Sequence, residues 1–148
     1  MTREDNFHHT FVQQLVAYAV WKFTPSMGIR DIPLSSFPCF SLELGDTSYT
    51  TFDFNGKATR GQQEFELRVY LAVGENQYNE SHTLRSNTVA SIEQFINTPY
   101  YSPPTMLPGD LYCIDRAELV SIDAWRFIAS ESRFVLHVRA KYTFSLFT

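Results

Sequence analysis

The pattern that comes nearest to a catalytic arrangement is a run of alternating charges in the middle of the chain. Glu64, Glu66 and Arg68 are separated by single residues, which places their side chains on one face if the segment is a β-strand. Metal-dependent nucleases hold carboxylates and a basic residue in this way, and Asp53 could complete the set. Such nucleases use lysine where this chain has Arg68. The wet face of an antiparallel strand carries alternating charges without any catalytic role, and this interpretation is the stronger one.

The histidines do not form a recognisable metal-binding or catalytic motif. His8 and His9 are adjacent, and neighbours along a helix do not face each other. His82 lies where a helix is expected to begin, and no carboxylate stands at a spacing that would orient His137. The chain also lacks a phosphate loop and the GxGxxG, HExxH and GxSxG patterns. We therefore predict no catalytic residue, no metal site and no cofactor.

A second charged row lies near the end of the chain. His137, Arg139 and Lys141 alternate along a segment that reads as a strand, so they share one face. This row could face a phosphate backbone. We favour instead a solvated strand face, or a row that forms salt bridges with Glu64 and Glu66 of a neighbouring subunit.

Composition limits the class of protein. The 148 residues fit one domain, and the formal net charge is −4, without the basic block of a dedicated nucleic-acid binder. No apolar run is long enough to span a bilayer, and the acidic N-terminus does not resemble a secretion signal. Cys39 and Cys113 are expected to be reduced core thiols. Aromatic residues make up 16% of the chain, more than polar loops need, and such residues dominate cores and subunit interfaces.

Apolar residues recur at helical spacing in two segments. The first predicts a helix over 6–23, capped by Asp5 or Asn6 and ended by Pro25. The second predicts a helix over 84–96. Ser81 could cap this second helix, which would end near Asn97. Proline-containing connectors are expected over 26–38 and 99–108, and loops over 74–79 and 125–132.

Period-two alternation predicts the strands. The segment 65–71 places Phe65, Leu67, Val69 and Leu71 on one face, and 134–144 is the clearest strand of all. Val120 and Ile122 are expected to point inward. Asn55-Gly56 predicts a two-residue hairpin turn after the aromatic segment 47–54, so that a ribbon over 47–61 projects from the sheet. The predicted strands are 40–44, 47–54, 64–71, 111–122 and 134–144.

This order of elements predicts an α+β fold. Two hairpins separated by a helix indicate a two-layer sandwich, with an antiparallel four-stranded sheet, two helices on one face and a projecting β-ribbon. The ribbon carries Tyr49, Phe52 and Phe54, and Phe147 lies near the end of the chain. A small monomer would be unlikely to leave this much apolar surface exposed. We expect these four residues to contact a neighbouring subunit or another protein.

Several segments together resemble the tail terminator, or tail completion, proteins of long-tailed bacteriophages. The resemblance lies in the N-terminal amphipathic helix, the Phe37-Pro38-Cys39-Phe40 entry to a strand, and the Gly45-Asp46 pair after it. It continues in the Gly61-Gln62-Gln63-Glu64 run, the second helix and the final hairpin. It covers most of the chain, which would be a single tail-terminator-like domain over 1–148.

The resemblance implies a structural virion protein rather than an enzyme. Proteins of this family assemble as hexameric rings that cap the tail tube, end its polymerisation and form the joint to the head. The partners would be further copies of the chain, the tail tube protein and a neck or head-completion protein. DNA would pass through the ring without tight binding, no membrane would be involved, and assembly would take place in the host cytoplasm. A small metal-dependent nuclease, or another neck or head-tail connector protein, is the alternative.

Overall fold

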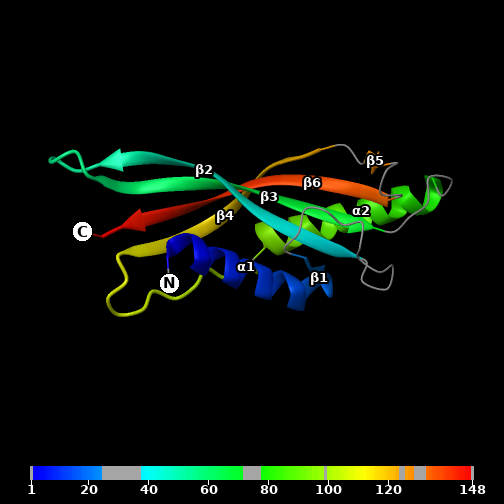
Figure 1. Ribbon diagram of the computed structural model, residues 1–148, viewed down its shortest axis with the longest axis horizontal. Helices are drawn as coiled ribbons and strands as arrows, with labels where there is room; N and C mark the ends of the chain where they lie inside the picture. The colour runs from blue at the N-terminus through cyan, green and yellow to red at the C-terminus, as the bar shows by residue number, and fades with distance from the viewer. Residues whose placement is uncertain are drawn as a thin grey trace.

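The structure is a computed structural model that describes residues 2–24, 38–71, 78–98, 100–123, 126–128 and 133–147. Two helices and six strands lie in these residues (Figure 1). In chain order they are α1 (Arg3–Ala19), β1 (Lys22–Phe23), β2 (Cys39–Phe52), β3 (Ala58–Leu71), α2 (Tyr78–Asn97), β4 (Tyr112–Ile122), β5 (Arg126–Ile128) and β6 (Arg133–Leu146).

The strands form one mixed, mostly antiparallel sheet with both helices on the same face (Figure 1). The continuous order is β1-β2-β3-β6-β4, and β5 pairs with β6 off this path. The predicted α+β class, with two helices on one face, is confirmed. The predicted four-stranded, wholly antiparallel sheet is wrong, because Lys22 and Phe23 form an extra strand that pairs in parallel with Cys39 and Phe40.

Helix α1 begins and ends earlier than its apolar pattern predicts. The Thr2 hydroxyl accepts a hydrogen bond from the Asp5 backbone N–H, so Thr2 is the N-cap rather than Asp5 or Asn6. At the other end Val20 adopts a left-handed conformation, with φ at 58°, and its N–H donates to the Val16 carbonyl. This cap stops the helix at Ala19 and turns the chain toward β1.

The core lies between the two helices and the sheet. Phe7 and Phe11 of α1 are fully buried, and the Phe7 ring stacks on Tyr142 of β6 with 4.0 Å between ring centroids. Phe95 of α2 meets Phe11 edge to face. The inward residues of the sheet alternate as the sequence predicts, so the helix-facing side of β3 and β6 is confirmed. These residues are Phe65, Leu67, Val69, Leu136, Val138, Ala140, Tyr142 and Phe144.

The β2–β3 hairpin extends past the ends of both helices (Figure 1). Its turn is not the predicted two-residue turn, because the Asp53 carbonyl accepts from the Gly56 N–H and the Asp53 N–H donates to the Lys57 carbonyl. Only Gly56 in this turn has a positive φ, which is the three-residue hairpin loop with a glycine in the left-handed position. Strand β3 stays paired with β6 as far as Arg60, so the free two-stranded part is shorter than predicted.

The last third of the chain differs from its predicted structure at two places. Strand β4 has a register shift between Leu119 and Ser121, which turns Val120 outward to 57% exposure, while Ile122 packs against the core as predicted. The expected loop over 125–132 is wrong in part, because 126–128 form β5. β5 pairs with the β6 edge beyond β4, so β4 and β5 follow each other along one edge.

Helix α2 is longer than predicted. It begins at Tyr78, so Ser81 lies inside the helix rather than at its cap, and it ends at Asn97 as expected. Neither helix in the described ranges is long and apolar enough to cross a membrane. The connector expected over 26–38 lies outside the described residues except for Pro38, and so does most of the loop expected over 74–79.

Candidate assembly surfaces

The charged residues predicted on strands β3 and β6 share the sheet face opposite the helices, which we call the polar face. Residue pairs across the two strands are Glu64 with Lys141, Glu66 with Arg139, and Arg68 with His137. Every pair except the last joins opposite charges, as expected for neighbouring strands. The polar face is defined by Glu64, Glu66, Arg68, His137, Arg139 and Lys141.

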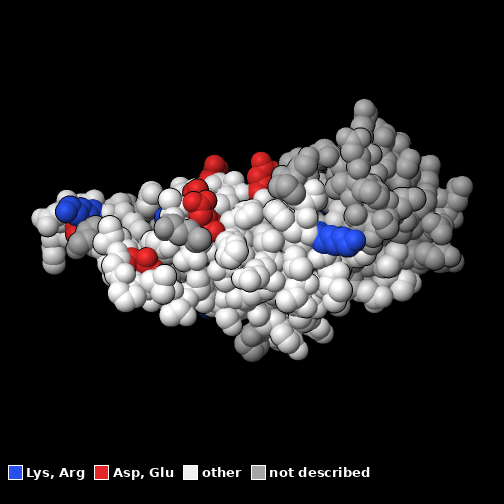
Figure 2. Space-filling model, turned by 60° about the horizontal axis from the view of Figure 1, so that its bottom comes forward, with Lys and Arg blue, Asp and Glu red and all other residues white. Residues whose placement is uncertain are grey.

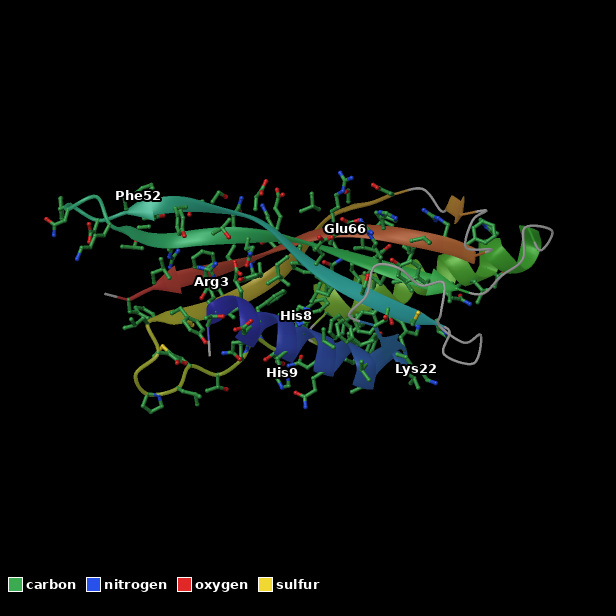
Figure 3. The ribbon with its side chains drawn as sticks, in the orientation of Figure 1. Arg3, His8, His9, Lys22, Phe52 and Glu66 are labelled. Carbon is green, nitrogen blue, oxygen red and sulfur yellow. The ribbon has the colours of Figure 1, made fainter. Side chains whose placement is uncertain are left out.

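Glu66 is the centre of the ion pairs on the polar face. Its Oε1 accepts from the Arg68 Nε at 3.1 Å and from the His137 Nδ1 at 2.8 Å. Figure 3 shows Glu66 in the middle of the sheet. Burial alone would raise the pKa of this carboxyl, but the hydrogen bonds and charges of Arg68 and His137 outweigh burial and lower the pKa. The carboxylate is therefore neutralised by residues of its own chain.

The other cations of the polar face also have acidic neighbours. Arg139 lies 3.7 Å from the Asp123 carboxylate, and Lys141 is flanked in register by Glu64 and Glu118. The predicted row of His137, Arg139 and Lys141 is therefore interleaved with acidic residues. This arrangement fits the salt-bridged interpretation better than a phosphate-binding strip.

A shallow hollow of about 490 Å³ lies in the polar face. Three glutamates from two strands line it, together with Arg139 and the outward-turned Val120. Its acidic residues are Glu43, Glu64 and Glu66. The nuclease-like set predicted from the sequence is only partly assembled here, because Asp53 lies in the hairpin turn, where its Oδ1 accepts from the Asn55 and Lys57 N–H groups.

The four aromatic residues predicted as an interface are all exposed at one end of the molecule, which we call the aromatic end. Tyr49 and Phe52 lie on β2, Phe54 in the turn, and Phe147 directly after β6. Figure 3 shows Phe52 near the tip of the hairpin. Phe54 is completely exposed and Tyr49 is 49% exposed. The rings of Tyr49 and the buried Phe144 meet edge to face, with 6.2 Å between their centroids. This contact holds Tyr49 on the helix side of the sheet.

The aromatic end includes apolar residues that sequence reasoning missed. The Phe147 N–H donates to the Leu111 carbonyl, and Leu111 is 67% exposed. Met106 and Leu107 in the preceding turn are also exposed. Met106 and Leu107 fall in the predicted proline-containing connector and Leu111 at the start of a predicted strand, although three large apolar residues within six positions are a signal of surface that is covered in an assembly.

Both long edges of the sheet are open in the part of the chain that the structure describes. β1 pairs with Cys39 and Phe40, and from Leu42 onward the described strands pair with β2 on one side, through β3. β4 has one strand partner, β6. Because β2, β3, β6 and β4 alternate in direction, the two open edges run antiparallel to each other. Open edges of this length are sites where another strand can add.

Of the histidines and cysteines, only His137 belongs to the surfaces described above. The His8 and Phe23 rings meet edge to face, and His9 is exposed on α1 (Figure 3). His82 is exposed on α2. Cys39 and Cys113 are both free thiols, as predicted, but Cys113 is only half-buried. Among the described residues, no three His, Cys, Asp or Glu side chains lie close enough together to hold a metal ion.

The side of the molecule that carries α1 differs from the polar face in its charged residues. Figure 2 shows few charged residues among the described atoms of this side.

Comparison with known proteins adds no family: no protein-family model and no curated protein sequence matches the chain. The case for function therefore rests on the geometry of the two surfaces and the two edges.

Proposed function

We propose that the chain is a structural subunit of a bacteriophage tail, assembled as a closed homo-oligomeric ring that caps the tail tube. The ring ends tube polymerisation and forms the joint to the neck or head. The observation that carries this proposal is the sheet with two open, antiparallel edges. If β2 of a second copy lies beside β4 of the first, all strands alternate in direction across the boundary.

A repeat of this contact favours closure. The contact joins two different edges, so it is heterologous, and a heterologous contact builds either a ring or a filament. Each copy contributes four alternating strands, an even number, so an antiparallel barrel can close at any number of copies. The helices then lie outside and the polar face lines the lumen. Six copies is the number that the resemblance to tail terminators implies.

The aromatic end supports the second contact that a tail cap needs. The hairpin that carries Tyr49, Phe52 and Phe54 extends past the helices (Figure 1), and these residues and Phe147 are exposed, so they can reach the tail tube or a neighbouring copy. Aromatic anchors of this kind carry much of the energy of protein interfaces. The neck or head-completion protein would meet the opposite end of the ring.

The test replaces two anchors of the aromatic end. Tyr49→Ser combined with Phe52→Ser should abolish assembly, measured by light scattering after size exclusion, while circular dichroism shows a folded chain. The matched control is Thr50→Ser with Thr51→Ser, on the same hairpin, which should assemble as wild type. If the Tyr49/Phe52 variant still forms the same ring and still stops the growth of purified tail tube, the aromatic end is not the interface.

A small metal-dependent nuclease is the alternative: Glu43, Glu64 and Glu66 line the hollow of the polar face, although no three described acidic, His or Cys side chains lie close enough together to hold a metal ion. The pairing of Glu66 with Arg68 and His137 favours the structural role. Cleavage of DNA in Mg²⁺ that stops in a Glu66→Gln variant would establish the nuclease and end the structural proposal. A further possibility, another neck or connector component, would show as a ring that binds the head-side partner but not the tube.

A further inference from the structure

A recess of about 370 Å³ opens beside the free edge of β4, under the end of α2. It touches Arg116, Ala117 and Glu118, three successive residues of β4. Because successive strand residues point to opposite faces, a recess that touches three in a row lies along the strand edge. Its inner wall is apolar, with the buried Ile96 and Tyr101 beside Ala117. Its remaining lining residues are Asn97, Thr98 and Pro103.

The shape and chemistry of this recess fit a single aromatic side chain with a polar tip. The apolar wall would accept a ring, and the rim offers hydrogen-bonding groups at Asn97, Thr98, Arg116 and Glu118. Tyrosine is such a side chain: its body is apolar, its hydroxyl needs a partner, and it loses little conformational freedom on binding.

Tyr49 lies on the other open edge of the sheet, level with Ile114 of β4 and therefore three residues along from Ala117, so the two copies must be staggered for Tyr49 to meet the recess. It pairs in register with Gly61, which pairs with Phe144 of the core, so Tyr49 lies on the same sheet face as the recess. Half of its surface is exposed. Within one chain, β3 and β6 separate β2 from β4 by about 14 Å, since neighbouring strands lie about 4.8 Å apart. The recess therefore cannot be filled by Tyr49 of its own chain.

We propose that the recess beside β4 binds Tyr49 of a second copy of this chain. This inference rests on the proposed ring, in which β2 of one copy lies beside β4 of the next. A knob on one edge and a hole beside the other, on the same face, make each copy complementary to the next. The contact fixes how far the two strands slide along each other, and it therefore selects one ring over a range of staggered assemblies.

A photo-crosslink from position 49 tests the contact directly. Tyr49 is replaced by p-benzoylphenylalanine, the assembled protein is irradiated, and crosslinked peptides are identified by mass spectrometry. We expect links to 96–103 or 116–118 of a second copy. The control is the same replacement at Ser48, the neighbouring residue that is exposed on the polar face. Ser48 should not label the recess.

A filled recess gives a second, independent readout. Asn97→Trp places an indole over the recess from an exposed position at the end of α2, and we expect the concentration for half-assembly to rise about tenfold or more. Asn87→Trp, exposed earlier on α2, is the matched control and should assemble as wild type. Tyr49→Phe should keep most of the assembly, whereas Tyr49→Ala should lose as much as Asn97→Trp.

The outcomes separate the inference from the proposed function. If a ring forms but position 49 crosslinks elsewhere, or Asn97→Trp assembles normally, the recess contact is wrong and the ring stands. If the chain remains a 17.1 kDa monomer with no intermolecular crosslink, alone and with tail tube protein, both proposals fail.

Discussion

At the scale of single residues, a buried polar cluster joins the start of α1 to the middle of the sheet. Gln63 is almost fully buried, and its Nε2 donates to the Glu4 carboxylate at 2.7 Å and to the Gly45 carbonyl. The Tyr142 hydroxyl donates to the Gln63 Oε1 at 2.5 Å and accepts from the Arg3 Nε. Such clusters stabilise a fold only while every member keeps its partner.

Removal of one hydroxyl from this cluster tests its contribution. Tyr142→Phe leaves the Gln63 carbonyl oxygen without its donor, so we expect the free energy of unfolding to fall by about 1–3 kcal/mol. Tyr101→Phe is the control, because the buried Tyr101 hydroxyl has no hydrogen-bond partner among the described residues. That variant should stay within about 0.5 kcal/mol of wild type or become more stable. Urea unfolding measures both, and equal losses would contradict the cluster.

The acid response of the fold depends on Glu66. Its folded-state pKa lies below the ordinary value of 4.5, so its ion pairs stabilise the fold above that value and are lost as the pH falls through the folded pKa. We expect the unfolding free energy of wild type to drop as the pH falls below about 4.5, and Glu66→Gln to show a flatter curve. If the urea midpoints of wild type and Glu66→Gln change in parallel with pH, the ionised Glu66 carboxylate is not stabilised in the folded state.

At the scale of elements, the hairpin and the sheet are held in register by the close approach of β2, β3 and β6 at one glycine. A side chain at Gly61 would place its Cβ 2.6 Å from the Phe144 ring and 2.7 Å from the Ser48 carbonyl oxygen. Only a glycine lets these three strands meet there with Phe144 buried. The position of Tyr49, opposite Gly61, follows from the same register.

Gly61→Ala therefore tests the register of the hairpin. The added methyl clashes with a ring and with backbone, so we expect a loss of about 1–3 kcal/mol in unfolding free energy and weaker assembly. Gly56→Ala in the turn meets no atom within 4 Å, and its cost of about 1 kcal/mol comes only from the positive φ. Its assembly should stay normal. A Gly61→Ala ring with wild-type stability would show that β2 and β3 can slip.

The accuracy of the sequence-based predictions follows from local physics at each element. The alternation in 64–71 and 134–144 predicted which residues face the helices, because both strands lie in the middle of the sheet with that face on the core. The predicted wet face is wrong at Tyr70 and Val135, which pair with each other and are both buried. The start of α1 was misplaced because Thr2, outside the apolar pattern, provides the cap. Val120 and β5 were missed because a bulge and a long-range pairing leave no local signal.

At the candidate surfaces, too, features with a local sequence signal could be predicted and features made by long-range contacts could not. Exposure of Tyr49, Phe52, Phe54 and Phe147 could be predicted, since aromatic residues that break the alternation of a ribbon have no core to enter. The recess beside β4 could not be predicted, because it forms where the end of α2 meets a strand that is distant in sequence.

At the scale of the whole molecule, the two faces of the sheet assign an inside and an outside to an assembly. In the proposed ring, the helix-covered face would form the outer layer, and the polar face, with its interleaved charges, would face the lumen. A lumen through which DNA passes should not bind the DNA tightly. Clustered cations bind phosphates tightly, whereas cations that are already ion-paired do not.

We therefore expect no duplex DNA binding near physiological salt. Fluorescence anisotropy with a labelled duplex should show no binding at micromolar protein. Arg139→Ala combined with Lys141→Ala should change stability or assembly more than any DNA signal, because Arg139 pairs with Asp123 and Lys141 lies between Glu64 and Glu118. Salt-sensitive binding that this double variant abolishes would instead favour a nucleic-acid function.

The mass of the protein in solution tests the central proposal most directly. Native mass spectrometry of the purified chain, alone and with tail tube protein, should show one closed species that is a multiple of 17.1 kDa, six copies if the resemblance to tail terminators holds. The same species should persist on dilution to micromolar concentration, because closure satisfies every edge. A uniform 17.1 kDa monomer under both conditions would contradict the ring, and with it the proposed role as the cap of a tail tube.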